Sequence, residues 1–450
     1  MTKHFGTDGI RGTFGDPLMC PDFAFRLGGA IGNFLKKVRP KESHCVIIGR
    51  DTRSSGVALS DALIAGLTRH EVCVYYADIL PTPAIARSII DKQADFGIIV
   101  TASHNPSCDN GIKLFDYRGY KLSNNEETLI ESILDREESA TTGSSTKNFR
   151  PIDACSSYVK NLRSFICPNS LNDWHIVLDL ANGATFETTP AVFLNSGASL
   201  HIIGNHPNGE NINDGFGSEC PELLASAVLK KKATIGIAHD GDGDRLVVCD
   251  ERGVIVDGDI ILGLLGKYAM QEGLLRTGTL VTTVHSNLGL DQALKSAGGK
   301  VERVEVGDRN VAHRMRELGS NIGGESSGHI IFSDFATTGD GLLAAIKIIE
   351  IMILTGKALS ELRQEVTLFP QLNHNLRVKE KIPLDRLESL KSSVHKIESY
   401  FEDQGRVLVR YSGTEPKLRL LVEGKDKSLV HKAMEEIKLA AVADLEVIDS

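Results

Sequence analysis

The chain has 450 residues, of which 41% are hydrophobic and 24% charged, and this composition argues against a largely disordered protein. Its 50 basic and 59 acidic side chains give a net charge of −9, and it contains one Trp and 8 Tyr. We expect no nucleic-acid partner, because the chain has no overall attraction to phosphate backbones and little aromatic surface for stacking on bases.

The start of the chain and its apolar stretches predict a cytoplasmic protein. Residues 1–6 contain no apolar signal core, and the longest apolar stretch, residues 341–354, is interrupted by Lys347 and Glu350. That stretch is too short to span a bilayer and predicts a buried helix, so we expect no membrane partner. The eight cysteines are scattered and form no C-x-x-C pair, which indicates reduced thiols in a cytosolic protein.

Short apolar strands alternate with helix-length segments up to residue 369. The runs at 45–48, 72–76 and 96–100 are apolar on both faces, as in strands of a mostly parallel sheet that helices cover on both sides. A strand and turn recur at residues 46–51, 176–183 and 280–287, and each is followed by a helical stretch and a strand that enters a polar loop.

This recurrence predicts three similar mixed-sheet α/β domains around a central cleft, although three generic βα units would give the same pattern. The small polar residues at 139–146 predict a linker. Beyond residue 369 the order changes to a helix near 383–401, strands at 406–411 and 418–423, and a helix near 427–442, which predicts a smaller α+β domain. The predicted domains are residues 1–150, 151–253, 254–369 and 370–450.

Asp240, Asp242 and Asp244 alternate with glycine between two apolar strands. The glycines allow the backbone to curl so that the carboxylates point inward, and three hard oxygen ligands favour Mg²⁺ or Ca²⁺ over zinc. An EF-hand is excluded because Arg245 stands where that loop needs glycine and because the flanks are strands. The alternative, an acidic surface turn, is disfavoured by the buried strands on either side.

Ser103 follows a buried strand, in the segment Thr-Ala-Ser-His-Asn-Pro at residues 101–106. Its hydroxyl could project into a cleft, although the segment taken alone favours a simple turn. A serine beside a magnesium site can carry a phosphoryl group. His104 is the adjacent residue, and because adjacent side chains usually point apart, no catalytic triad is predicted.

Four other segments carry candidate groups. The loop at 410–419 offers backbone N–H groups, hydroxyls and two arginines, so it is either a phosphate cradle or a charged hairpin turn. The loop at 323–329 is either a sugar-binding loop or a glycine-rich turn. Lys113 is a proton carrier or a solvated lysine. In the N-terminal loop, Arg11 is available for a phosphate, whereas Asp8 is expected to hold the loop together.

Together these loops resemble those of the α-D-phosphohexomutase superfamily. The matching segments follow the family order and are residues 5–12, 101–106, 240–245, 324–329 and 410–416. Within the superfamily, Ser412-Gly413-Thr414 and the loop at 324–329 resemble the phosphoglucosamine mutase branch.

The resemblance implies an isomerase that interconverts glucosamine 6-phosphate and glucosamine 1-phosphate, a step towards UDP-N-acetylglucosamine. It implies a phosphoserine at Ser103, a hexosamine 1,6-bisphosphate as intermediate and activator, and bound Mg²⁺. The implied magnesium ligands are Ser103, Asp240, Asp242 and Asp244. The implied catalytic residues are Ser103, Lys113, Arg11, His104 and Arg245. The implied substrate-binding residues are Glu325, Ser327, His329, Arg410, Ser412, Gly413, Thr414 and Arg419. A monomer and a homodimer both fit the resemblance.

Three other functions stay open at this point. The first is a phosphoglucomutase or phosphomannomutase, and the second is a magnesium-dependent phosphatase. The third is a non-catalytic phosphosugar-binding protein on the same fold, which the presence of Ser103 and all three aspartates disfavours.

Overall fold

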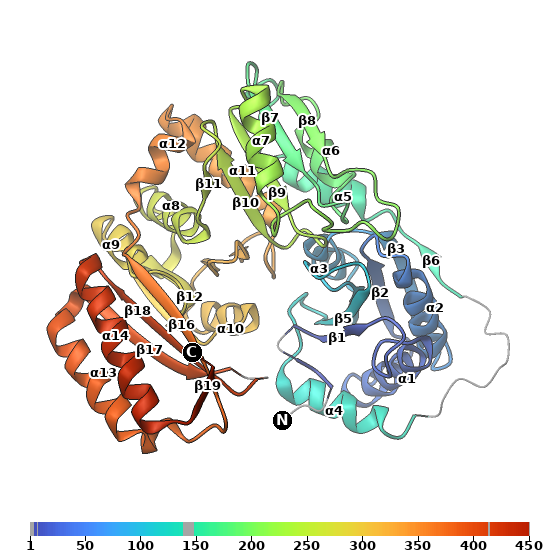
Figure 1. Ribbon diagram of the computed structural model, residues 1–450. Helices are drawn as coiled ribbons and strands as arrows, with labels where there is room; N and C mark the ends of the chain where they lie inside the picture. Colours follow the sequence, from blue (N-terminus) through green and yellow to red (C-terminus); the bar gives the residue numbers. More distant parts are fainter. Residues whose placement is uncertain (1–3, 7, 138–147, 413–414, 450) are drawn as a thin grey trace. The chain divides into compact units, whose positions relative to one another are not determined.

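The computed structural model describes residues 4–6, 8–137, 148–412 and 415–449, and it divides into two compact units (Figure 1). The first unit comprises Met1–His285 and Leu294–Glu365, and the second comprises Ser286–Ala293 and Val366–Ser450. Three sheets belong to the first unit and a fourth to the second. The linker predicted at 139–146 lies outside the described residues, and the four predicted domain ranges stay predictions.

The first sheet has the strand order β1-β5-β4-β2-β3-β6, with β2, β3, β4 and β6 parallel and β1 and β5 joined by antiparallel pairing. Its strands are β1 (Ile10–Thr13), β2 (Cys45–Arg50), β3 (Cys73–Ile79), β4 (Phe96–Val100), β5 (Asp109–Asp116) and β6 (Arg150–Pro151). The accompanying helices are α1 (Pro21–Val38), α2 (Ser55–Thr68), α3 (Thr82–Asp91) and α4 (Asn124–Leu134).

The second sheet has the order β11-β10-β9-β7-β8 and the third β13-β12-β14-β15. The second is formed by β7 (His175–Asp179), β8 (Ser199–Ile203), β9 (Ile235–His239), β10 (Leu246–Asp250) and β11 (Ile255–Val256), with helices α5 (Cys155–Arg163), α6 (Thr188–Phe193) and α7 (Glu222–Lys231). The third is formed by β12 (Thr279–Thr283), β13 (Lys300–Val304), β14 (Ile322–Gly324) and β15 (Ile330–Phe332). Its helices are α8 (Gly258–Gln271), α10 (Asp308–Leu318), α11 (Gly341–Thr355) and α12 (Leu359–Leu362), whereas α9 (Gly289–Ser296) is divided between the two units.

The three sheets share one topology, which confirms the predicted recurrence. In each, a central strand (β2, β7 or β12) pairs in parallel with two neighbours, and one of these neighbours pairs with an antiparallel strand. The polar loops at residues 101–106, 240–245 and 323–329 occupy the same place in this topology. They lie between β4 and β5, between β9 and β10, and between β14 and β15. Loops at the carboxyl ends of strands are where α/β sheets form their sites.

The fourth sheet is antiparallel, with the order β17-β18-β16-β19. It contains β16 (Gln371–Val378), β17 (Gly405–Tyr411), β18 (Lys417–Gly424) and β19 (Val447–Asp449), with helices α13 (Glu388–Phe401) and α14 (Lys427–Asp444). The order of helices and strands expected beyond residue 369 is therefore confirmed.

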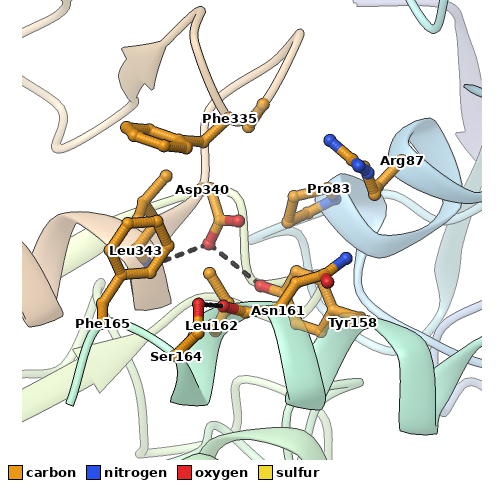
Figure 2. Close-up of a pocket in the computed structure, with 11 residues that line it drawn as sticks. Pro83, Arg87, Tyr158, Asn161, Leu162, Ser164, Phe165, Phe335, Asp340 and Leu343 are labelled. Atoms are coloured by element: carbon orange, nitrogen blue, oxygen red, sulfur yellow. Dashed lines mark hydrogen bonds between the residues drawn. The ribbon is translucent and has the colours of Figure 1, made fainter. Parts of the chain in front are cut away.

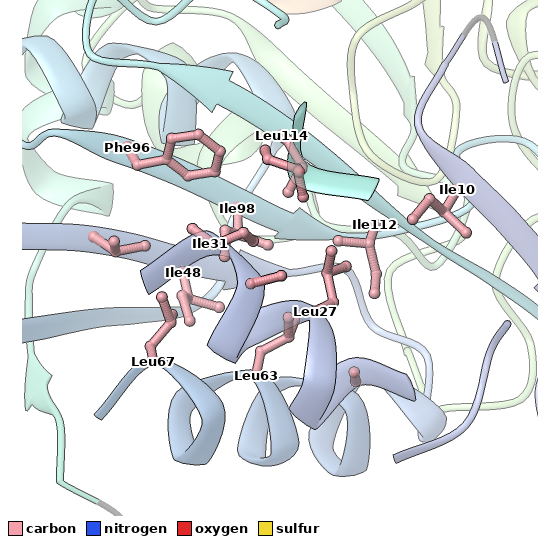
Figure 3. Packing of buried hydrophobic residues seen from close by; sticks show 14 of the residues in the cluster. Ile10, Leu27, Ile31, Ile48, Leu63, Leu67, Phe96, Ile98, Ile112 and Leu114 are labelled. Carbon is pink, nitrogen blue, oxygen red and sulfur yellow. The ribbon is translucent and has the colours of Figure 1, made fainter. Parts of the chain in front are cut away.

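Apolar side chains of α1 and α2 pack on one face of the first sheet (Figure 3). Leu27 and Ile31 of α1 and Leu63 of α2 contact the same cluster as Ile48 and Ile98 of the central strands, and all five are fully buried. On the opposite face, the side chains of Ile85 and Ile89 of α3 lie against Gly49 of β2 and Gly97 of β4. Burial on both faces explains why these strands are apolar throughout and not alternating. No helix in the described part of the chain is long and apolar enough to cross a membrane.

The predicted buried helix at 341–354 is α11, and Asp340 caps its first turn. The Asp340 carboxylate accepts hydrogen bonds from the Leu343 backbone N–H at 2.9 Å and from the Tyr158 hydroxyl of α5 at 3.0 Å (Figure 2). A cavity of about 360 Å³ adjoins this contact. Burial raises the pKa of Asp340 to about 6, although both hydrogen bonds oppose the shift.

We expect the Asp340→Asn variant to gain stability over the wild type as the pH rises. The folded state raises the pKa of Asp340 above the unfolded value, so the stability linked to this proton is complete below about pH 4 and lost through pH 6. Asparagine keeps a neutral acceptor, and its advantage in free energy of unfolding should grow by about 2 kcal/mol from pH 4.5 to 7.5. Urea denaturation at both pH values measures this change. The exposed control Asp385→Asn should show no such growth, and an equal effect at both pH values for Asp340→Asn would contradict the assignment.

Candidate active site

Ser103 contacts the predicted metal ligands directly. It lies three residues beyond β4, its side chain is buried, and its Oγ donates a hydrogen bond to Asp240 Oδ2 at 2.5 Å. The two residues are 137 positions apart in the sequence. The loop after β4 and the loop after β9 therefore meet at one point, where the predicted nucleophile faces the predicted metal ligands.

The carboxylates of Asp240, Asp242 and Asp244 converge and are buried, with one oxygen atom of each within 4.8 Å of the others. In the described part of the chain, no hydrogen-bond donor reaches Asp242 Oδ1, and Asp244 Oδ1 meets only the His329 ring, whose Nδ1 lies 3.6 Å away. Burial, together with the charges of the other two carboxylates, raises the pKa of Asp240 well above its usual value. Buried carboxylate oxygens without donors are costly unless a cation meets them, so this set of hard donors fits Mg²⁺.

Gly241 and Gly243 meet two different steric demands of this loop. A Cβ atom on Gly241 would lie 2.6 Å from the carbonyl oxygen of Ser103, and Gly243 has a φ of +73°. A larger residue at 241 would push the loop at residues 240–245, the predicted metal loop, away from Ser103. Any side chain at 243 would strain the backbone. The alternation of aspartate and glycine therefore allows two backbones to approach closely.

Lys113 of β5 is buried against the triad, so the alternative of a solvated lysine is wrong. Its Nζ lies 2.8 Å from Asp242 Oδ2 and 3.0 Å from Asp244 Oδ2. Asp8 Oδ2 lies 3.4 Å away. Burial opposes the charge of Lys113, but these three carboxylates outweigh burial and raise its pKa well above the usual value. Lys113 is therefore an ammonium group that partly neutralises the triad.

A cavity of about 450 Å³ opens beside Ser103. Most of the predicted catalytic and sugar-binding residues of the first unit line it, namely Arg11, Ser103, His104, Arg245, Glu325 and His329, and the predicted metal ligand Asp244 lines it as well. Ser327 is exposed and is not among the lining residues, so the structure does not bring it to this cavity.

The His104 ring faces the hydroxyl of Ser103, contrary to the expectation that adjacent side chains point apart. The distance from His104 Nδ1 to Ser103 Oγ is 3.4 Å, and the left-handed backbone of Ser103, with a φ of +54°, turns its side chain out of the usual alternation. Burial, and after it the charge of Arg245, lowers the pKa of His104. A neutral imidazole is thus favoured next to Ser103.

Glu325 and His329 extend the site from the loop between β14 and β15. Glu325 Oε1 accepts a hydrogen bond from the Gly307 backbone N–H at 3.0 Å, and burial raises the pKa of Glu325. The His329 ring lies 3.6 Å from Asp244 Oδ1 and 3.3 Å from Asp308 Oδ2. Burial lowers the pKa of His329, but the two carboxylates outweigh burial and raise it to about 9. His329 therefore presents a cationic ring to the cavity.

Sequence reasoning missed Lys121 and Asp308, which also line the cavity. Lys121 Nζ lies 2.5 Å from Asp308 Oδ2 and also pairs with Asp8, whose carboxylate in turn contacts Arg11. Asp8 contacts Arg11 within its own loop, as expected, and it also contacts Lys121 and Lys113 of other segments. No local pattern marks Lys121, and the one sequence signal for Asp308 is the glycine before a helix start.

The predicted phosphate loop lies in the second unit, between β17 and β18. Arg410 and Arg419 are paired across these antiparallel strands, and Arg419 Nη2 donates to Ser412 Oγ at 3.4 Å. Like charges placed opposite each other repel, so this arrangement favours an anion between them. Lys381, which the sequence did not single out, donates to the carbonyl oxygen of Ser412 at 2.6 Å. Gly413 and Thr414 lie outside the described residues.

Comparison with known proteins identifies the family. Four models of the phosphoglucomutase/phosphomannomutase family match the chain: α/β/α domain I at residues 2–141, domain II at 156–253, domain III at 257–369 and the C-terminal domain at 374–440. The phosphoglucosamine mutase of Pelobacter propionicus is 44% identical over 431 residues, covering 95% of each chain. That of Halalkalibacterium halodurans is 44% identical over 451 residues, covering 99% of each. The chain belongs to the phosphoglucosamine mutase family of the α-D-phosphohexomutases.

Solved structures share the fold of this phosphoglucosamine mutase family member. A phosphoglucomutase/phosphomannomutase family protein from Burkholderia thailandensis has a TM-score of 0.82 at 24% identity and covers 99% of this chain and 100% of its own. The N-acetylphosphoglucosamine mutase of Aspergillus fumigatus, in complex with GlcNAc-6P and magnesium, has a TM-score of 0.64 at 16% identity. This match covers 98% of the present chain and 96% of the Aspergillus chain.

In this member of the family, we expect Thr82→Val to weaken Mg²⁺ binding. Thr82 opens α3, its Oγ1 donates to Asp242 Oδ2 at 2.5 Å, and its backbone N–H donates to the Asp242 carbonyl oxygen at 2.9 Å. Valine keeps the shape but loses the hydroxyl that orients the carboxylate, and such losses cost about 10–100-fold in metal affinity. Calorimetric titration of metal-free protein with Mg²⁺ measures the change.

The matched control for this variant is Thr68→Val. The Thr68 hydroxyl bonds carbonyl oxygens of its own helix α2, so its loss should leave the Mg²⁺ affinity unchanged. An affinity for Thr82→Val equal to that of Thr68→Val would show that the hydroxyl does not orient Asp242.

Proposed function

We propose that this chain is an isomerase that interconverts glucosamine 6-phosphate and glucosamine 1-phosphate through a phosphoserine at Ser103. The observation that carries the proposal is the contact of Ser103 Oγ with Asp240 Oδ2 inside a carboxylate triad that fits Mg²⁺. The names of the curated relatives support the sugar, and the Aspergillus fumigatus complex with GlcNAc-6P and magnesium supports the metal.

Each half-reaction transfers one phosphoryl group. The bond between Ser103 Oγ and phosphorus breaks as sugar O1 bonds to phosphorus, and the O1 proton passes to a base. The resulting hexosamine 1,6-bisphosphate reorients, its 6-phosphoryl group returns to Ser103 Oγ, and O6 recovers a proton. Mg²⁺ bound by Asp240, Asp242, Asp244 and the Ser103 phosphate would neutralise charge on the phosphoryl oxygens.

The residues around Ser103 suit the other roles of this reaction. We propose that Lys113 exchanges the proton and that Arg11, His104 and Arg245 contact the transferring phosphate, because the latter three line the same cavity as Ser103. Glu325, Ser327 and His329 are proposed to bind the sugar. The loop with Arg410, Ser412, Gly413, Thr414 and Arg419 is proposed to bind the phosphate that is not reacting.

Two further properties belong to this proposal. All eight cysteines are free, which supports action in the reducing cytoplasm. The reaction needs one phosphosugar substrate and no nucleic acid or membrane, and either a monomer or a homodimer fits it.

A comparison of substrates tests the proposed function. Purified protein with Mg²⁺ and a trace of hexose 1,6-bisphosphate is given glucosamine 6-phosphate, glucose 1-phosphate and mannose 1-phosphate in parallel, and kcat/KM is measured for each. We expect the highest value for glucosamine 6-phosphate. A clear preference for glucose 1-phosphate or mannose 1-phosphate would overturn the sugar assignment. Steady release of inorganic phosphate would indicate a phosphatase, and binding without turnover would indicate a non-catalytic protein.

A further inference from the structure

The Arg53 side chain is fully buried, and its guanidinium bonds the loop that carries Ser103. Arg53 follows β2, and its Nε donates to Asp51 Oδ2 at 2.9 Å. Its two Nη atoms donate to backbone carbonyl oxygens of Ser103, Asn105 and Pro106 in the loop between β4 and β5 and of Asp109 at the start of β5. One buried side chain thus bonds four carbonyl groups, and those of Ser103 and Asn105 also accept hydrogen bonds from Asn213 Nδ2, at 2.9 and 3.0 Å.

The peptide groups on both sides of Ser103 are held through this arginine and its partner. The Ser103 carbonyl oxygen accepts a hydrogen bond from Arg53 Nη2 at 3.1 Å. The Ser103 N–H donates to Thr101 Oγ1 at 2.9 Å, and that hydroxyl donates to Asp51 Oδ2 at 2.6 Å. Asp51 and Arg53 therefore connect to Ser103 from its N–H side and its carbonyl side.

This support coincides with an unusual backbone conformation. Ser103 has a φ of +54°, in the left-handed region that a residue with a side chain occupies only when its surroundings hold it there. In this conformation Ser103 Oγ reaches Asp240. A relaxed backbone would carry the hydroxyl away from the triad, and a misplacement of about 1 Å costs on the order of 100-fold in rate.

We propose that Arg53, paired with Asp51, is a positioning residue that holds Ser103 in its left-handed conformation and so directs Oγ to the metal triad. The inference rests on the proposed function, because it treats Ser103 as the group that carries the phosphoryl. Arginine suits this task because its rigid planar fork donates in several fixed directions, whereas the single ammonium of lysine cannot reach four carbonyl oxygens at once.

The test compares Arg53→Lys with Arg363→Lys. Arg363 Nε also donates to a fully buried carboxylate, Asp250 Oδ2 at 2.8 Å, but its partner lies at the end of β10 that is away from the metal loop. We expect Arg53→Lys to lower kcat about 100-fold with KM changed less than about twofold. The rate at which hexose 1,6-bisphosphate phosphorylates Ser103, followed by intact mass in a single turnover, should fall in the same ratio. Because Arg53→Lys also leaves buried carbonyl groups without a donor, it should melt below Arg363→Lys, and the rates are compared at a temperature at which both variants are folded.

A second variant keeps the test decisive if Arg53→Lys does not fold. Thr101→Val preserves side-chain volume and the Asp51–Arg53 pair but removes the hydroxyl that bonds the Ser103 N–H, and we expect a kcat about tenfold below wild type with KM unchanged. The inference is overturned if the folded variants keep the kcat of Arg363→Lys, or if their loss lies in KM alone. The proposed function fails separately, and only if the wild type has no mutase activity or Ser103→Ala retains it.

Discussion

Ser103→Ala is expected to abolish isomerisation of glucosamine 6-phosphate and to remove the phosphate from the protein. The hydroxyl that contacts Asp240 is the group that bonds phosphorus in the proposed cycle. Loss of a nucleophile costs about 10⁴-fold or more in kcat, so turnover should fall below detection in a coupled assay. Intact mass should show one phosphoryl group on the wild type and none on the variant.

Ser107→Ala is the matched control for this variant, since Ser107 belongs to the same loop between β4 and β5. It should retain both the phosphoryl group and wild-type turnover. A Ser103→Ala protein that turns over at the wild-type rate would refute the phosphoserine mechanism. A variant that loses its phosphate but still isomerises would place the acceptor elsewhere.

Lys113→Met is expected to destabilise the metal-free protein and to increase the stabilisation that Mg²⁺ provides. Lys113 is the buried cation between Asp242, Asp244 and Asp8, and removing one partner of a buried ion pair costs about 3–5 kcal/mol. Because Mg²⁺ would supply the missing positive charge, its addition should raise the melting temperature of the variant by more than that of the wild type. If Lys113 also exchanges the proton, kcat should fall by about 10²–10⁴-fold.

The control for Lys113→Met is Lys357→Met, which removes a more exposed cation paired with Glu365. Exposed pairs contribute about 0–1 kcal/mol, so this variant should melt close to the wild type and respond to Mg²⁺ as the wild type does. Equal melting temperatures for the two metal-free variants would show that Lys113 does not neutralise the triad. An equal response to Mg²⁺ would show that the metal and the ammonium do not compensate the same charge.

The metal loop was predictable because its signal is local. Aspartate alternates with glycine within five residues, and the apolar runs on both sides show that the loop joins two buried strands. The close approach of Gly241 to the Ser103 carbonyl explains why glycine stands there, but the sequence shows only the residue and not the neighbour that demands it. The position of Ser103 at the end of a buried strand was likewise readable, whereas its left-handed backbone was not.

The residues that sequence reasoning missed all act through distant partners. Thr82 lies 160 residues from the aspartate that its hydroxyl bonds, and Lys121 lies 187 residues from Asp308. Arg53 lies about 50 residues from the loop it bonds, in a segment with no feature other than its place after a strand. A lone threonine, lysine or arginine has an ordinary surface role in most proteins, so none of these residues stands out before the chain is folded.

By itself, the sequence determined the alternation of buried strands and helices, the three recurring loops, the antiparallel tail and the three carboxylates that converge in the fold. These features depend on residue type and short-range spacing, which the chain carries along its length. Only the tertiary structure decided that Lys113 is a buried ammonium, that the His104 ring faces the Ser103 hydroxyl and that Ser327 lies outside the cavity. The burial and the charge of each of these side chains depend on contacts with segments that are distant in the sequence. Local spacing does not predict those long-range contacts.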